Sequence, residues 1–286
     1  MMFQSLAFDA FFIKATAALK PYLGDLVCIG GCANALYRYH EHAHDMPFPS
    51  LGTKDIDWAS PQKLLQGKRK SIAELMIAAQ FREEIMGSQE KAVVKYSPKD
   101  ENLAADIEFL CSESGLPGGR SRSGTPLPHA VQPGLMVQPL RYLELLRHNT
   151  WKINLDLIPE FVALHNLRIR IPNPAAYVVQ KVLIRDQRRS LQSAAKDCYY
   201  IYEVAVIFRN ALDALAQEAA SLRETFKPWL KRFPKIADAL FADENAEGPV
   251  SALQVFTEMG GIQGVKTGDL TAEMISKAVA KLLGAM

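Results

Sequence analysis

The stretch Asp25-Leu-Val-Cys-Ile-Gly-Gly31, followed by Thr53-Lys-Asp-Ile-Asp57, decides the fold. The first reads as a short buried strand that ends in a glycine pair, and the second reads as a strand because polar and apolar residues alternate along it. Since side chains alternate across a strand, Asp55 and Asp57 are expected on one face and Ile56 on the other. Two carboxylates so close repel each other unless a cation lies between them, so this pattern favours a divalent-cation site.

A further acidic strand is predicted later in the chain. Residues 103–111 read as a strand, and Asp106 and Glu108 within it again fall on one face. Magnesium prefers carboxylate oxygens and keeps substrate phosphates as the rest of its shell. Three convergent acids from the two acidic strands would therefore suit a two-metal site.

The glycine pair Gly30-Gly31 predicts a phosphate contact. A backbone without Cβ atoms can approach a phosphate closely, and the N–H groups at the start of a following helix face that anion. Neither this pair nor the alternating acids is specific alone, since exposed strands commonly carry solvated carboxylates. The order of the two motifs and their flanking sequence are more specific than either motif.

The flanking sequence predicts a mixed α/β unit followed by helices. Helices are expected at residues 3–20, 33–40 and 71–86, and further strands at 54–59 and 91–96. Residues 112–134 are dense in glycine, proline and serine and are expected to form a linker or a flap. Strands are then expected at 136–146, 151–157 and 167–171, and helices from about 175 and at 191–208, 210–226, 228–242 and 271–284. The fold class is α/β (α+β), with a small mixed sheet and flanking helices in residues 1–135 and a mostly helical domain in residues 136–286.

Composition favours an ordinary globular protein. Hydrophobic residues make up 49% and charged residues 22% of the 286 residues, which excludes a disordered or collagen-like chain. The net charge of +2 is too near neutral to imply a nucleic-acid or membrane partner by itself. The 4 cysteines are scattered and are expected to be reduced and buried. The apolar N-terminus reads as an amphipathic helix, and without a segment able to span a membrane a cytoplasmic location is expected.

Four motifs occur in a characteristic order. They are Ile29-Gly-Gly-Cys-Ala33; Thr53-Lys-Asp-Ile-Asp57; a later acid at Asp106, with Glu108 as the second candidate; and a helix with Pro174, Lys181, Arg185 or Arg188, and Lys196-Asp197. In this order the motifs resemble the nucleotidyltransferase superfamily of the DNA polymerase β type, in particular the AbiEii-like toxin group and related uncharacterised bacterial proteins. The resemblance covers residues 25–112 and 167–208 and rests on motif order rather than on extended identity.

The resemblance implies a small mixed-sheet nucleotidyltransferase core and a metal-dependent reaction. A nucleoside monophosphate would pass from a nucleoside triphosphate to an RNA, protein or small-molecule acceptor, and pyrophosphate would leave. By resemblance, Asp55, Asp57 and Asp106 are the catalytic acids and the ligands of Mg²⁺ or Mn²⁺, and Asp106 also helps to activate the acceptor. The nucleotide-binding residues it implies are Gly30, Gly31, Thr53, Lys54, Lys181, Arg185 and Asp197.

Two departures from the family pattern bear on function. A histidine-containing loop lengthens the interval between glycines and acids, and Cys32 replaces the usual small polar residue. One alternative is therefore a catalytically silent module that binds nucleotide or a protein partner with the same fold. Another is an unrelated α/β protein whose motifs coincide by chance. Within the enzyme interpretation, a toxin with a partner antitoxin is one option, and no membrane partner is expected.

Two further motifs have alternative interpretations. His40, His42 and His44 would share a face if their segment were extended and could then bind a transition metal, whereas solvated loop histidines are the simpler interpretation. Arg120 and Arg122 lie in a glycine- and serine-rich run and would contact a nucleic acid or triphosphate electrostatically, or only solubilise a loop.

Overall fold

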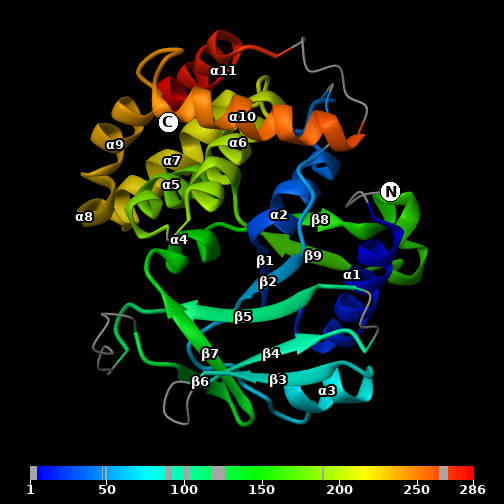
Figure 1. Ribbon diagram of the computed structural model, residues 1–286. Helices are drawn as coiled ribbons and strands as arrows, with labels where there is room; N and C mark the ends of the chain where they lie inside the picture. The colour runs from blue at the N-terminus through cyan, green and yellow to red at the C-terminus, as the bar shows by residue number, and fades with distance from the viewer. Residues whose placement is uncertain are drawn as a thin grey trace. The chain divides into compact units, whose positions relative to one another are not determined.

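The chain divides into two compact units (Figure 1). The computed structural model describes residues 5–46, 48, 50–87, 92–99, 103–116, 126–188, 190–263 and 270–286. One unit comprises residues 1–39 and 52–172, and the other comprises residues 40–51 and 173–286. The division falls at residue 172 rather than near 135, because β7 (Leu135–Leu140) pairs with β5 (Asp106–Ser112) in the first unit.

The first unit is built on a mixed sheet, as the fold class predicted. The described strands run in the order β1 (Val27–Ile29), β2 (Asp55–Ala59), β5, β4 (Val93–Ser97) and β3 (Arg82–Met86). β2 and β5 are parallel, whereas β1–β2, β3–β4 and β4–β5 are antiparallel. β7 runs parallel to β5 and also pairs with β6 (His129–Gln132), and a separate ribbon joins β8 (Trp151–Asn154) to β9 (Arg168–Ile171).

Helices and aromatic side chains complete the core of this unit. One side of the central strands buries Ile56, Trp58, Ile107 and Phe109. Phe12 in α1 (Leu6–Ala18) stacks on Phe161 with ring centroids 5.4 Å apart. The other described helices of the unit are α2 (Gly30–Leu36), α3 (Ile72–Ala78) and α4 (Leu143–Arg147), with short 3-10 turns at Lys20–Tyr22, Tyr37–Tyr39, Leu155–Leu157 and Pro159–Leu164.

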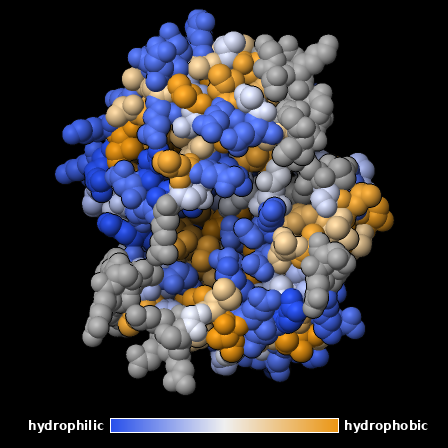
Figure 2. Space-filling view, viewed as in Figure 1, coloured by the Kyte–Doolittle hydropathy of each residue, from blue (hydrophilic) through white to orange (hydrophobic). Residues whose placement is uncertain are grey.

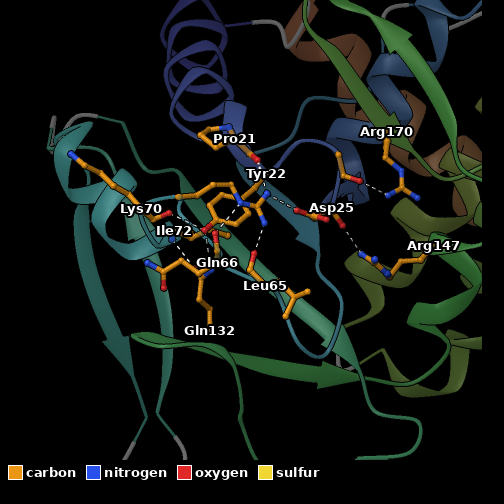
Figure 3. Close-up of polar contacts among 12 residues, drawn as sticks. Pro21, Tyr22, Asp25, Leu65, Gln66, Lys70, Ile72, Gln132, Arg147 and Arg170 are labelled. Carbon is orange, nitrogen blue, oxygen red and sulfur yellow. Dashed lines mark hydrogen bonds and ion pairs between the residues drawn. The ribbon is translucent and has the colours of Figure 1, made fainter.

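Arginine side chains fix the turn that enters β1 (Figure 3). Arg69 pairs with the Asp25 carboxylate at 2.8 Å and lies over the Tyr22 ring, 4.0 Å from its centroid. Arg147 donates to the carbonyl of Asp25 at 3.1 Å, and Arg170 donates to the carbonyl of Gly24 at 2.8 Å. The start of β1 is thereby held by charge-assisted hydrogen bonds, which are stronger than neutral ones.

The second unit is helical. Asn173 caps α5 (Pro174–Leu183) by accepting from the Ala176 amide at 2.8 Å, and Pro174 occupies the first turn, where its missing N–H costs nothing. Arg185–Gln187 forms a 3-10 turn, and the later helices are α6 (Leu191–Ile207), α7 (Leu212–Thr225), α8 (Lys227–Leu230), α9 (Phe233–Leu240), α10 (Glu247–Gln263) and α11 (Ala272–Ala285). In Figure 2 this unit shows mixed hydrophilic and hydrophobic side chains on the visible face, as in ordinary globular proteins.

The histidine-containing loop belongs to this helical unit. The amide of His44 donates to the carbonyl of Ile207 at 2.8 Å, and the Phe48 ring lies 4.7 Å from that of Phe256. No described helix is both long enough and apolar enough to pass through a membrane.

The structure corrects several element predictions. Residues 71–86 do not form one helix: α3 ends at Ala78, Gln80 takes a left-handed conformation (φ 61°), and Arg82–Met86 is strand β3. Pairing of β3 with β4 overrides the helical propensity of this segment. The expected strand at 136–146 ends at Leu140, and Leu143–Arg147 is helical instead. The sequence interpretation also missed α10, because Gly248 and Pro249 near its start and a glycine pair near its end obscured the periodicity.

Candidate active site

Four carboxylates share one face of the central sheet. β2 and β5 pair in a register that places Asp55 opposite Asp106 and Asp57 opposite Glu108. Residues directly opposite each other on paired strands lie on the same face, and alternation sends their neighbours to the other. Ile56 and Ile107 are accordingly fully buried, whereas Asp55 is exposed and the other three acids are half-buried. Neighbouring strands thus bring together the acids of both predicted strands.

Gly30 lies against the Asp57 carboxylate. It has a positive φ of 64°, and a Cβ atom built at this position would overlap Oδ2 of Asp57. Only glycine combines this backbone conformation with so close an approach at little cost. Gly31 follows within α2 and is buried. The glycine pair therefore lies beside the acidic face, and the side chain missing at Gly30 makes room for Asp57.

Short-range hydrogen bonds hold the start of β2. The Thr53 hydroxyl donates to the carbonyl of Asp55 at 3.2 Å, and its oxygen lies 3.4 Å from the amide of the same residue. The Cys32 thiol donates to that carbonyl at 3.5 Å. Burial raises the pKa of Cys32 well above its ordinary value, with added contributions from Cys28, Asp57 and Asp55, so the group is a thiol and not a thiolate. Cys32 thus donates a hydrogen bond at the position where a small polar residue was expected.

Lys54 lies between Thr53 and Asp55 in the sequence. Its carbonyl accepts from the amide of Asp106 at 3.3 Å, which extends the pairing of β2 and β5 by one bond. Its side chain is exposed. The backbone of Lys54 therefore helps to align the two acidic strands, and its ammonium group lies in solvent.

A lysine that the sequence interpretation missed lies among these acids. Lys95 on β4 forms an ion pair with Glu108, and its Nζ lies 3.8 Å from Oδ2 of Asp106. Burial acts to lower the pKa of Lys95, but Glu108, Asp106 and Asp55 raise it above its ordinary value. Burial raises the pKa of Asp106, Lys95 opposes that shift, and Glu84 and Glu108 add to it. In the sequence Lys95 lies between apolar Val94 and Tyr96, which indicates its face of the strand but not its partners on β5.

The carboxylates share a face without forming a ready cage. Among the residues that the structure describes, no three or more His, Cys, Asp or Glu side chains are grouped so that they could hold a metal ion. The second-strand acids Asp106 and Glu108 are instead engaged with Lys95. The face therefore carries acids of the kind that bind a metal ion, and Lys95 lies beside two of them, Asp106 and Glu108.

The cations of the fourth motif lie in the helical unit. Lys181 is 6% exposed and pairs with Asp197 at 2.6 Å, and its Nζ lies 5.2 Å from the ring centroids of Tyr177 and Tyr200. Arg188 binds both Asp197 oxygens, at 2.5 and 2.9 Å. Asp197 therefore holds two cations, as expected for a buried charge that needs partners. Arg185 forms an ion pair with Glu247.

Comparison with known protein families identifies the family of the chain. A family model described as nucleotidyltransferase matches residues 10–224, which include both acidic strands and the Lys181–Asp197 pair. The chain belongs to the nucleotidyltransferase family. Neither a curated protein nor a solved structure matches it. Family membership makes a nucleotide the expected substrate and nucleotidyl transfer the expected class of reaction.

The histidine motif and the arginine-containing run remain to be placed. The rings of His40 and His42 lie 5.2 Å apart, and that of His40 packs against Phe208. Burial, with the charge of His42, lowers the pKa of His40 to about 4, so the ring is neutral at pH 7. His44 is tied to Ile207 through its backbone amide, and the described residues offer no metal cluster here either. Arg120 and Arg122 lie outside the described residues.

Proposed function

We propose that the protein is a metal-dependent nucleotidyltransferase that moves a nucleoside monophosphate from a nucleoside triphosphate to an acceptor hydroxyl. The observation that supports this most directly is the pairing of Asp55 with Asp106 and of Asp57 with Glu108 across two parallel strands. It occurs beside Gly30, where an added side chain would overlap Asp57, in a chain that belongs to the nucleotidyltransferase family.

The donor set suits Mg²⁺ or Mn²⁺. Both are hard cations that take carboxylate oxygens and complete their shells with water and phosphate oxygens. Asp55 and Asp57 would hold the ion from one strand, and Asp106 would join them from the next. A bound ion would neutralise charge on the transferring phosphoryl group. Asp106, the acid with the raised pKa, would accept hydrogen bonds from the acceptor hydroxyl and orient it.

The chain's own residues would position the triphosphate. Gly30 and Gly31 would let the backbone approach a phosphate next to Asp57, and Thr53, whose hydroxyl donates to the carbonyl of Asp55, would help to hold that strand. We propose nucleotide contacts for Lys54, whose side chain is exposed, for Arg185, and for the group formed by the cations Lys181 and Arg188 with the Asp197 carboxylate. In that group Asp197 would act by orienting Lys181 and Arg188, because its carboxylate already pairs with both.

The acceptor is proposed only by class: an RNA, a protein side chain or a small molecule. We also propose kinship with the AbiEii-like group, a toxin role with a partner antitoxin, and a cytoplasmic location. These three proposals go beyond what family membership implies.

A transfer assay tests the enzymatic activity directly. Purified protein is incubated with each α-³²P-labelled nucleoside triphosphate, Mg²⁺ or Mn²⁺, and total RNA or protein extract. Labelled product that is lost in Asp57→Asn and kept in Asp238→Asn, an exposed acid of α9, would support the proposal.

One observation favours a second candidate, a catalytically silent nucleotide-binding module of the same fold. Lys95 engages the acids of β5, which an active site would need for metal or acceptor. Calorimetric titration with each triphosphate and Mg²⁺, run beside the transfer assay, separates the two functions. Binding without transfer to any acceptor favours the silent module, whereas transfer that depends on Asp57 excludes it.

A further inference from the structure

Lys95 completes a row of charges across the sheet. The strand registers place Asp57 opposite Glu108, Glu108 opposite Lys95, and Lys95 opposite Glu84. Directly opposed residues share a face and have Cβ atoms about 5 Å apart. The lysine therefore interrupts an otherwise acidic row on the face that carries the candidate site.

The ammonium group of Lys95 is held between the two β5 acids. It forms an ion pair with Glu108 and lies 3.8 Å from Oδ2 of Asp106, while its side chain is 24% exposed. Glu84 on β3 is engaged elsewhere, with Arg82 at 3.2 Å and with the Ser97 hydroxyl at 2.5 Å. Lys95 is thus paired with the acids of β5, the strand next to β2. The charge of Asp55 on β2 also raises the pKa of Lys95.

We infer that Lys95 is a resident counter-ion of the acidic face, which neutralises Asp106 in the metal-free protein and competes with a divalent cation for that carboxylate. Glu108 is then a positioning residue, because its ion pair holds the ammonium group beside Asp106. This inference rests on the proposed function and deepens it. It accounts for four acids that share a face without forming a metal cage in the described residues.

The physical argument is electrostatic. Without a cation, four carboxylates on two neighbouring strands would repel one another, and one internal ammonium group reduces that repulsion. A divalent ion brought to Asp55 and Asp57 also meets the positive charge of Lys95, which lies beside Asp106 on the neighbouring strand. Removing that charge is expected to tighten divalent binding on the order of tenfold at moderate ionic strength.

The experiment measures Mn²⁺ affinity without nucleotide, by calorimetry and by the electron paramagnetic resonance signal of free Mn²⁺. Four proteins are compared: wild type, Lys95→Met, the double variant Lys95→Met/Glu108→Gln, and Lys99→Met. The double variant keeps the net charge of the wild-type face but has no cation at Asp106. Lys99 is exposed beyond the end of β4, so its variant controls for the loss of one positive charge nearby.

We expect Lys95→Met and the double variant both to bind Mn²⁺ on the order of tenfold more tightly than wild type, and Lys99→Met to match wild type. Equal affinity of the double variant and wild type would overturn the inference, since net charge alone would then explain the single variant. Equal affinity of all four proteins would also overturn it but would leave the proposed metal site standing. Absence of Mn²⁺ binding in every protein would overturn both.

Thermal unfolding with and without Mn²⁺ provides a second measurement. Lys95→Met leaves Asp106 and Glu108 without their common cation, so the metal-free variant is expected to unfold at a lower temperature than wild type. Saturating Mn²⁺ should raise its unfolding temperature more than that of wild type, because the ion takes over the role of the lysine. A variant equally destabilised with and without Mn²⁺ would show that Lys95 has only a structural role.

Discussion

Gly30 occupies a position next to Asp57 at which no side chain fits. Its φ is 64°, and a Cβ atom there would overlap Oδ2 of the carboxylate. Two separate requirements, backbone conformation and space, thus fall on one residue at the junction of β1 and α2. The glycine motif and the acidic motif are therefore in direct contact, and a side chain added at Gly30 is expected to displace the Asp57 carboxylate as well.

Gly30→Ala tests this relationship against a matched control. The left-handed conformation costs a non-glycine residue about 1–3 kcal/mol, and the added methyl group must also displace the Asp57 carboxylate. Gly67 has a similar φ of 58°, but a Cβ atom there meets nothing within 4 Å. Both variants should lose stability in urea denaturation, whereas only Gly30→Ala should lose Mn²⁺ affinity and nucleotidyl transfer. Equal Mn²⁺ affinity in the two variants would contradict the proposed closeness of glycine and metal site.

Asp57→Asn should abolish transfer and leave the fold intact. Asp57 lies opposite Glu108 among carboxylates that repel one another, so neutralising it removes repulsion along with the metal ligand. The temperature of unfolding without metal should therefore stay level or rise, and the stabilisation by Mn²⁺ should be lost. Calorimetric unfolding beside the transfer assay checks both parts. Full transfer activity in this variant would remove Asp57 from the proposed mechanism.

Features of the site that depend on residues close together in the sequence could be predicted, whereas those that depend on the pairing of distant strands could not. Asp55 and Asp57 were expected on one face because strand alternation is a local property, and the structure places them so. Lys95 was missed because its role depends on the register of β4 against β5, which no local pattern specifies. The sequence therefore predicted the acidic pair but not the lysine that lies on the same face.

The fold shows the same limit. Helices with a clear cap were predicted closely: α6 begins after Ser190, whose side chain accepts from the Ser193 amide at 3.0 Å. Residues 82–86 were predicted as part of a helix because residues 71–86 show helical periodicity, but pairing with β4 makes them a strand. Likewise, the pairing of β7 with β5 places Leu135–Leu140 in the sheet unit, and sequence composition could not reveal that pairing.

Asp197→Asn should destabilise the helical unit strongly. Asp197 is 3% exposed and compensates Lys181, which is 6% exposed, so neutralising it leaves a buried cation without its counter-ion. Loss of one partner from a buried ion pair costs about 3–5 kcal/mol. Asp186→Asn is the control, because the Asp186 side chain is 75% exposed and its contact with Arg232 is 4.0 Å long. Urea denaturation followed by circular dichroism should show a lower midpoint for the first variant alone.

Rescue distinguishes the charge from the packing at this position. Asp197→Asn combined with Lys181→Met removes both members of the buried pair and retains an apolar side chain of similar length. If the unpaired cation causes the loss, the double variant should be more stable than Asp197→Asn. A double variant that is less stable than either single variant would show that packing around Tyr177 and Tyr200 matters more.

His40 should make the stability of the helical unit depend on pH. Burial, with His42, lowers its pKa in the folded protein from the ordinary 6.5 to about 4. Between these values the unfolded chain binds a proton that the folded chain does not, so stability rises with pH over this window and falls as pH drops from about 6.5 to about 4. His40→Gln removes the group and should flatten this part of the profile relative to wild type. Urea midpoints measured across the window, with the ring of His40 followed by NMR, check this; a wild-type His40 that titrates near its ordinary value would contradict the burial argument.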